Sequence, residues 1–118
     1  MTRHIDFGKK GEDMAVEWLT EKGYTILHRN WRHGRFEVDI IATLKGIYHF
    51  IEVKSGRAGD YGYPEERVNG RKLKSMMKVA AAWLYQNPGS RQVQYNVLAI
   101  TIRNGNVPEY FLFEDVYL

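Results

Sequence analysis

The sequence has 118 residues, of which 44% are hydrophobic and 26% charged, and its net charge at pH 7 is +3. This length and balance are those of a globular domain with a hydrophobic core of its own. The absence of cysteine excludes disulfide bonds, cysteine-ligated zinc and a cysteine nucleophile, and is typical of a reducing compartment. The start lacks the apolar stretch of a signal peptide, and no apolar run approaches the roughly 20 residues of a membrane span. We therefore expect a cytoplasmic protein without membrane association.

The first predicted element is a helix over residues 8–22, where apolar residues recur at helical spacing, and Gly23 ends it. Glu12 lies on the same face as the apolar residues, so its carboxylate is expected to lean toward the rest of the fold. The simpler alternative is an acid that only benefits from the helix macrodipole. Strands are predicted next over residues 24–31, 35–43 and 47–54.

The second half of the chain begins with a predicted loop over the glycine-rich residues 55–64. A helix is then predicted over 70–86, capped by Asn69, and two more strands over 92–102 and 107–113. The expected core stripe of this helix is Leu73, Met76, Met77, Ala80 and Leu84. The order α-β-β-β-α-β-β predicts an α/β fold with a mixed central sheet flanked by helices, because a helix between two strands favours a parallel crossover.

Four charges interrupt the two most strand-like segments. If residues 45–46 alone form the turn, Asp39 lies opposite Glu52, Glu37 lies opposite Lys54, and all four side chains share one face. Facing carboxylates resist joint ionisation, and a divalent cation resolves their repulsion. Such an ion can activate water, while Lys54 orients that water or stabilises charge growing on a phosphate. The alternative is a Glu37–Lys54 salt bridge, with Asp39 and Glu52 as surface or edge acids.

Positive charge is concentrated in the block that begins at the end of these strands. Residues 54–78 carry seven basic and three acidic side chains, a net charge of +4, whereas the rest of the chain carries −1. A polyanion would be attracted to this block, although a solvated helix face is an equal alternative. Tyr61 and Tyr63 are candidates either for stacking on unpaired bases or for packing the loop. The candidate nucleic-acid contacts are Arg57, Arg67, Arg71, Lys72, Lys74 and Lys78.

Asp39, followed about a dozen residues later by Glu52-Val53-Lys54, resembles the PD-(D/E)xK nuclease signature. Glu12 on the preceding helix is similar to the arrangement in archaeal-type Holliday-junction resolvases. Over residues 8–100 the chain also resembles the YraN-like family of uncharacterised bacterial proteins. The segments that carry this resemblance, in the family's order, are GKKGEDMA, GYTILHRNWR, FEVDIIA and FIEVK.

The resemblance implies a single restriction-endonuclease-like domain over residues 1–118 and a Mg²⁺- or Mn²⁺-dependent nuclease that cleaves phosphodiester bonds in DNA, including structured or branched DNA. It implies that Asp39 and Glu52 ligate the metal with help from Glu12. Lys54 becomes the catalytic base or transition-state stabiliser, and Glu37 an accessory acid. The expected partner is nucleic acid, DNA in preference to RNA, with the choice between a monomer and a homodimer left open.

Two positions depart from the family pattern. Gly56 stands where the family usually has an arginine, with Arg57 next, and Asn96 stands where a late strand usually has an aspartate. Two other functions therefore stay open. One is a non-catalytic nucleic-acid-binding module on the nuclease fold, and the other is an interaction subunit that pairs through the apolar residues 110–118.

Overall fold

The computed structural model describes residues 7–57, 70–89, 92–103 and 107–115. Asn69, the side chain of Leu73 and most of the predicted loop lie outside what it describes. The observed element order agrees with the predicted one, and the strand and helix limits differ from the predictions by at most three residues. The elements are α1 (Phe7–Glu21), β1 (Thr25–His33), β2 (Phe36–Leu44), β3 (Ile47–Arg57), α2 (Gly70–Gln86), β4 (Gln92–Ile102) and β5 (Glu109–Phe113).

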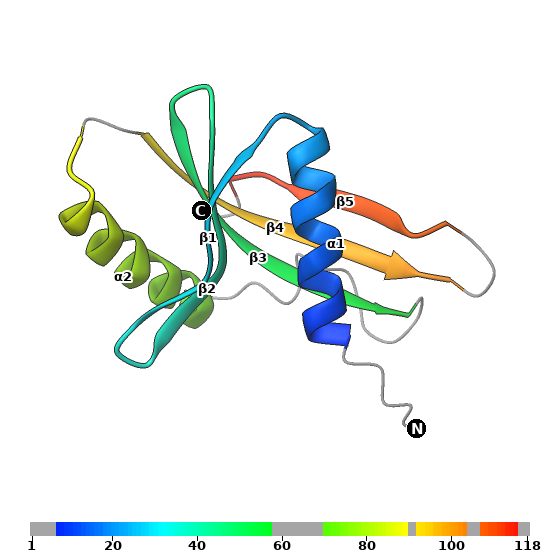
Figure 1. The fold of residues 1–118 in the computed structure, drawn as a ribbon. Helices are drawn as coiled ribbons and strands as arrows, with labels where there is room; N and C mark the ends of the chain where they lie inside the picture. The colour runs from blue at the N-terminus through cyan, green and yellow to red at the C-terminus, as the bar shows by residue number, and fades with distance from the viewer. Residues whose placement is uncertain (1–6, 58–69, 90–91, 104–106, 116–118) are drawn as a thin grey trace.

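The strands form one sheet in the order β1-β2-β3-β4-β5. Strands β3 and β4 are parallel, and the other three neighbouring pairs are antiparallel. The helix α2 therefore connects the two parallel strands, as predicted for a helix between strands. The helices α1 and α2 lie on opposite faces of the sheet (Figure 1), so the protein is an α/β fold with a mixed sheet between two helices, in agreement with the restriction-endonuclease-like class.

Each face of the sheet carries its own hydrophobic cluster, because successive strand residues point to opposite sides. The facing pair Ile40–Ile51 belongs to the cluster under α1, and the next pair, Ile41–Phe50, belongs to the cluster under α2. The α1 cluster also contains Ala15, Leu19, Leu98 and Ile100. The α2 cluster also contains Val38, Tyr48, Met76, Val79, Ala80 and Trp83. Neither of the two described helices has the length and apolar character that crossing a membrane requires.

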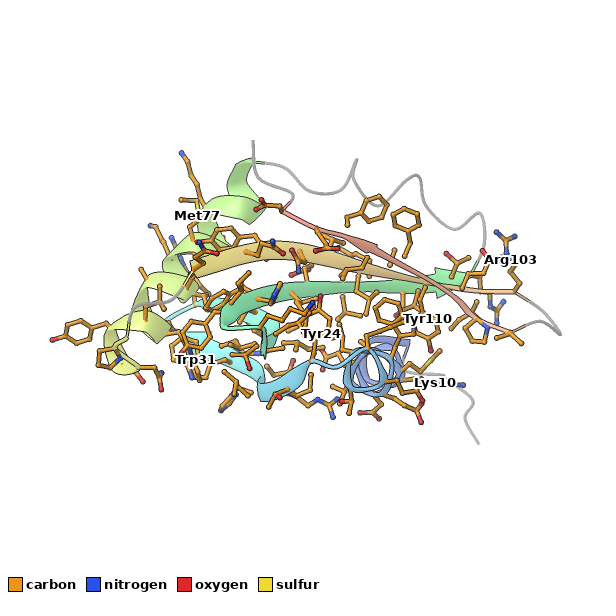
Figure 2. The ribbon with its side chains drawn as sticks, turned by 90° about the horizontal axis from the view of Figure 1, so that it is seen from above. Lys10, Tyr24, Trp31, Met77, Arg103 and Tyr110 are labelled. Atoms are coloured by element: carbon orange, nitrogen blue, oxygen red, sulfur yellow. The ribbon has the colours of Figure 1, made fainter. Side chains whose placement is uncertain are left out.

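Two predictions about the second half of the chain were wrong. Met77 is 47% exposed and lies on the outer side of α2 (Figure 2), while Val79 is fully buried. The helix is rotated so that Met76, Val79, Ala80 and Trp83 face the sheet. The predicted loop also starts later than expected, because β3 continues to Arg57 with unbroken pairing to β4.

Candidate functional site

The turn between β2 and β3 determines which side chains can meet across the hairpin. Lys45 and Gly46 have φ angles of 53° and 81°, and two positive φ values are the mark of a type I′ two-residue turn. Leu44 and Ile47 pair directly on either side of it. The predicted register is therefore confirmed, although Lys-Gly is not the dipeptide most typical of this turn.

The two strands separate just beyond the Ile40–Ile51 pair, which is the last pair in their ladder. Past this point β2 remains paired with β1, and β3 remains paired with β4. We call this separation the fork. Here Asp39 Oδ2 accepts a hydrogen bond from the Val53 backbone N at 2.8 Å. A side-chain oxygen of β2 thus takes the place of a backbone carbonyl as the acceptor. The ladder thus stops one pair short of the predicted Asp39–Glu52 pair, and the two acids meet at the opening instead.

A pocket of about 240 Å³ opens at the fork. Three of the four predicted charges contribute to it, which supports their predicted placement on one face of the sheet. Glu52 is only 7% exposed, so its carboxylate is held inside the fold. We call this cavity the acidic pocket, and its lining residues are Arg35, Phe36, Glu37, Asp39, Glu52, Ser75 and Met76.

The carboxyl group of Asp39 has a raised pKa, about 7 in place of its ordinary 3.8. Burial is the main cause, because it disfavours the charged form, and the negative charge of Glu52 is the second. The hydrogen bond from Val53 lowers the pKa of Asp39, while Glu12 and Glu37 raise it further. The predicted resistance of these carboxylates to joint ionisation is therefore present.

Lys54 and Glu37 have different partners from those predicted. Lys54 Nζ lies 3.5 Å from Glu52 Oε2, on its own strand. Glu37 Oε2 lies 3.5 Å from Arg32 Nε, which faces it across the β1–β2 ladder. The predicted Glu37–Lys54 pairing is therefore wrong, because the fork separates the strands before these residues can face each other.

Glu12 leans toward the sheet, as its place on the apolar face of α1 predicted. Its side chain is 18% exposed, and its Oε1 lies 3.8 Å from Arg29 Nη2. Its Oε1 also accepts a hydrogen bond of 2.8 Å from Asn30 Nδ2. The positive φ of Asn30, 52°, interrupts the regular geometry of β1 at this contact. Glu12 is thus held against β1, close enough to raise the pKa of Asp39 but not among the residues lining the acidic pocket.

Three carboxylates line the acidic pocket, and two of them, Asp39 and Glu52, lie at the fork, while Glu37 is paired with Arg32. Within the described part of the chain, no three histidine, aspartate or glutamate side chains converge as a ready-made metal cage. Mg²⁺ is commonly held by only one or two carboxylates, with water and substrate phosphate completing its shell. A cation between Asp39 and Glu52 would also relieve the repulsion that raises the pKa of Asp39. The donor set therefore fits a hard divalent cation with few protein ligands.

The structure describes only part of the predicted basic block. Lys74 and Lys78 are exposed on α2, and Arg57 is exposed at the end of β3. Arg71 and Lys72 belong to the start of α2, but their side chains lie outside the described residues, as do Arg67, Tyr61 and Tyr63 entirely. Among the described cations, Arg35 lines the pocket, and Lys54 is paired with Glu52.

Arg35 was missed by the sequence analysis, although a signal for it exists. Arg35, Glu37 and Asp39 stand on alternate residues, and such residues share one face of a strand. Ser75 and Met76 reach the pocket from α2, and nothing in the local sequence indicates how that helix docks.

The departure at Asn96 lies away from the pocket. Asn96 pairs with Ile51 in the sheet, and Ile51 belongs to the cluster under α1. Its Nδ2 donates to His49 Nδ1 at 2.9 Å, and its Oδ1 accepts from the Asp115 backbone N at 2.9 Å. The residue therefore has a structural role on the opposite face from the acidic pocket.

Comparison with known proteins gives a consistent result. The family model described as "Uncharacterised protein family UPF0102" matches residues 11–100. A UPF0102 protein from Chloroherpeton thalassium is 40% identical over 126 residues, which cover 99% of this chain and 97% of the relative. Another, from Persephonella marina, is 40% identical over 98 residues, covering 82% and 84%. A third, from Bacteroides thetaiotaomicron, is 37% identical over 106 residues, covering 90% and 88%.

Proposed function

The chain belongs to the uncharacterised protein family UPF0102, in agreement with its resemblance to YraN-like proteins, and from this premise we propose that it is a metal-dependent nuclease that hydrolyses phosphodiester bonds in DNA. The observation that carries the proposal is the fork, where the half-buried Asp39 and the buried Glu52 line one pocket. The raised pKa of Asp39, beside the buried carboxylate of Glu52, is costly for stability and is typical of functional sites. The cations Arg35 and Lys54 beside them suit a phosphate-containing substrate.

In this proposal Asp39 and Glu52 hold Mg²⁺ or Mn²⁺, which supplies Lewis-acid activation of water and of a phosphoryl oxygen. Lys54 keeps its ammonium 3.5 Å from Glu52 Oε2, where it orients the attacking water and stabilises negative charge on the phosphate. Arg35 binds a phosphate oxygen through its planar guanidinium. Hydrolysis then consumes one water, breaks one P–O bond and leaves a phosphate monoester and a hydroxyl group.

The two remaining acids act through their surroundings. Glu37, paired with Arg32, adds negative potential to the pocket and serves as the accessory acid. Glu12, on α1, is positioned by Asn30, and it adds to the negative field at Asp39. Both therefore favour retention of a cation at the fork, Glu37 from the lining of the pocket and Glu12 from α1 outside it.

The decisive experiment is a cleavage assay with purified wild type and Glu52→Gln on duplex, single-stranded, flap and four-way-junction DNA and on RNA. Each substrate is incubated with Mg²⁺, Mn²⁺ or EDTA. We expect cutting that requires the metal and falls by at least about 100-fold in Glu52→Gln, since one of two cation ligands is lost. Glu17→Gln, an exposed acid on α1, is the matched control and should cut like wild type. Folded wild type that cuts none of these substrates would contradict the proposal.

A second candidate function is a nucleic-acid-binding module that does not cut. It is favoured by the contacts of Glu12, which is engaged with Asn30 and Arg29 and does not line the acidic pocket. The exposed Lys74 and Lys78 on α2 would then be part of the working surface. Binding that weakens steeply with salt, without metal-dependent turnover, would favour this candidate.

A further inference from the structure

A second and larger cavity adjoins the acidic pocket, between the β1–β2 hairpin and the C-terminal half of α2. Its volume is about 500 Å³, within the range of about 300–1,000 Å³ that is usual for sites that hold small ligands. We call it the aromatic groove. The hairpin contributes His33 and Phe36, and the helix contributes Lys78, Ala81, Ala82, Tyr85 and Gln86.

Phe36 lines both the aromatic groove and the acidic pocket. The two cavities are therefore neighbours that share one aromatic wall. A DNA strand with a phosphate at Asp39 and Glu52 would bring the adjoining nucleotide to the groove. Because the two cavities share Phe36, a strand bound in the acidic pocket could also contact the groove.

Three of the residues lining the groove carry aromatic rings, and the two on the hairpin, His33 and Phe36, are supported by the core. His33 lies parallel to Trp31, with 6.5 Å between ring centres and 8° between ring planes. Trp31 in turn packs edge-on against the buried Trp83 at 5.4 Å. On the other side Tyr85 is 88% exposed, so its ring is not used by the core. The small side chains of Ala81 and Ala82 leave the space between these rings.

The positive charges around the groove are complementary to the negative charge of a nucleic acid. Lys78 Nζ lies 5.1 Å from the centre of the Phe36 ring, and Arg35 Cζ lies 5.6 Å from it. None of the residues lining the groove is acidic. Aromatic faces bind bases of any sequence, and adjacent cations bind the phosphates that connect them. A purely apolar partner would gain nothing from this arrangement of cations.

We propose that the aromatic groove binds one unpaired base, that of the nucleotide next to the phosphate in the acidic pocket. A base inside a duplex would first have to be unpaired and unstacked, which disfavours its entry relative to a base that is already unpaired. The groove therefore assigns the substrate class: a strand that is single or has an unpaired nucleotide at the site of cutting, such as a flap or a branch. The inference rests on the proposed function for the position of the strand, and it deepens that function by naming the substrate.

The test is a binding measurement without cleavage, with Ca²⁺ in place of Mg²⁺ and again in EDTA. The probe is 2-aminopurine placed in a single-stranded oligonucleotide and in a blunt duplex of the same sequence. Wild type should bind the single strand more tightly and quench the probe by stacking. Ala81→Leu, which fills the groove from an exposed position, and Tyr85→Ala should each weaken single-strand binding about 5- to 100-fold while changing duplex binding less than about twofold.

Phe111→Ala is the control, because Phe111 is an exposed aromatic residue on β5 and should bind like wild type. Equal single-strand affinity in wild type, Ala81→Leu and Tyr85→Ala would overturn the inference, as would equal losses for single strand and duplex. Stacking in the groove by a wild type that never cuts would support the inference and contradict the nuclease. Metal-dependent cutting with an affinity insensitive to Ala81→Leu would contradict the groove alone.

Discussion

Two sets of buried polar groups lie on opposite faces of the sheet and differ in how they avoid buried charge. Under α1, His49 and Asn96 are buried, and hydrogen bonds link them to each other and to the backbone N of Asp115. An amide nitrogen only donates, so His49 Nδ1 accepts and the neutral ring carries its proton on Nε2. Under α2, Asp39 and Glu52 are two acids that cannot both ionise at low cost.

The difference separates a neutral polar site inside the fold from the acidic site at which we propose a cation. Burial lowers the pKa of His49, and Glu114 opposes that shift only in part, so the ring stays neutral. Its Nδ1 is hydrogen-bonded to Asn96, whereas its buried Nε2 has no hydrogen-bond partner among the described residues. Burial and the charge of Glu52 raise the pKa of Asp39. The neutral pair leaves no charge inside the fold, whereas a proton or the proposed cation would relieve the repulsion between the two carboxylates. A substitution in either set, or a cation added to the acids, should therefore have a distinct effect on stability.

The largest effect on stability is expected for Asp39→Asn. An acid whose pKa is raised to about 7 binds more protons in the folded than in the unfolded state, so stability falls as pH rises from about 4 through 7. The introduced amide would keep an oxygen for the Val53 N–H and carry no charge. We expect the variant to be more stable than wild type by roughly 2–4 kcal/mol at pH 8, and nearly equal at pH 4, in denaturant unfolding. The same pH slope in both proteins would contradict this account.

A loss of stability of the opposite kind is expected for Asn96→Ala. The substitution leaves His49 and the Asp115 N–H without their partner and creates a cavity where the side chain is fully buried. We expect a cost of about 2–3 kcal/mol in the free energy of unfolding. Cleavage per folded molecule should stay at the wild-type level, because the acidic pocket lies on the other face. Reduced cleavage by a fully folded variant would show that the two sets are coupled.

The smallest effect is expected for added Mg²⁺. A cation that binds the folded state alone raises the melting temperature, by an equivalent of about 1–2 kcal/mol when it exceeds its Kd about 10- to 30-fold. We expect this rise for wild type and Asn96→Ala at pH 8, and its loss in Asp39→Asn and Glu52→Gln. The rise should shrink below pH 7, where a proton on Asp39 competes with the cation. Equal rises in all four proteins would place the cation elsewhere.

Local patterns in the sequence were enough to predict the elements and the hairpin that brings the acids together. Strand alternation and a two-residue turn determine register within one hairpin, so Asp39 and Glu52 were expected to be close, and they line one pocket. Helical spacing also placed Glu12 on the face that leans toward the sheet. These features depend on contacts between residues near each other in the chain.

The tertiary structure decided the features that depend on distant partners. The fork exists because β3 pairs with β4, which begins 46 residues after Gly46 of the β2–β3 turn. It removes the expected Glu37–Lys54 pair. The rotation of α2 exposes Met77 and brings Ser75 to the acids. Periodicity within a helix or strand predicts which residues share a face. The orientation in which that face packs on the sheet depends on side-chain packing throughout the core. The sequence by itself therefore determined the acids and their register, and only the packed fold determined the pocket and the groove beside it.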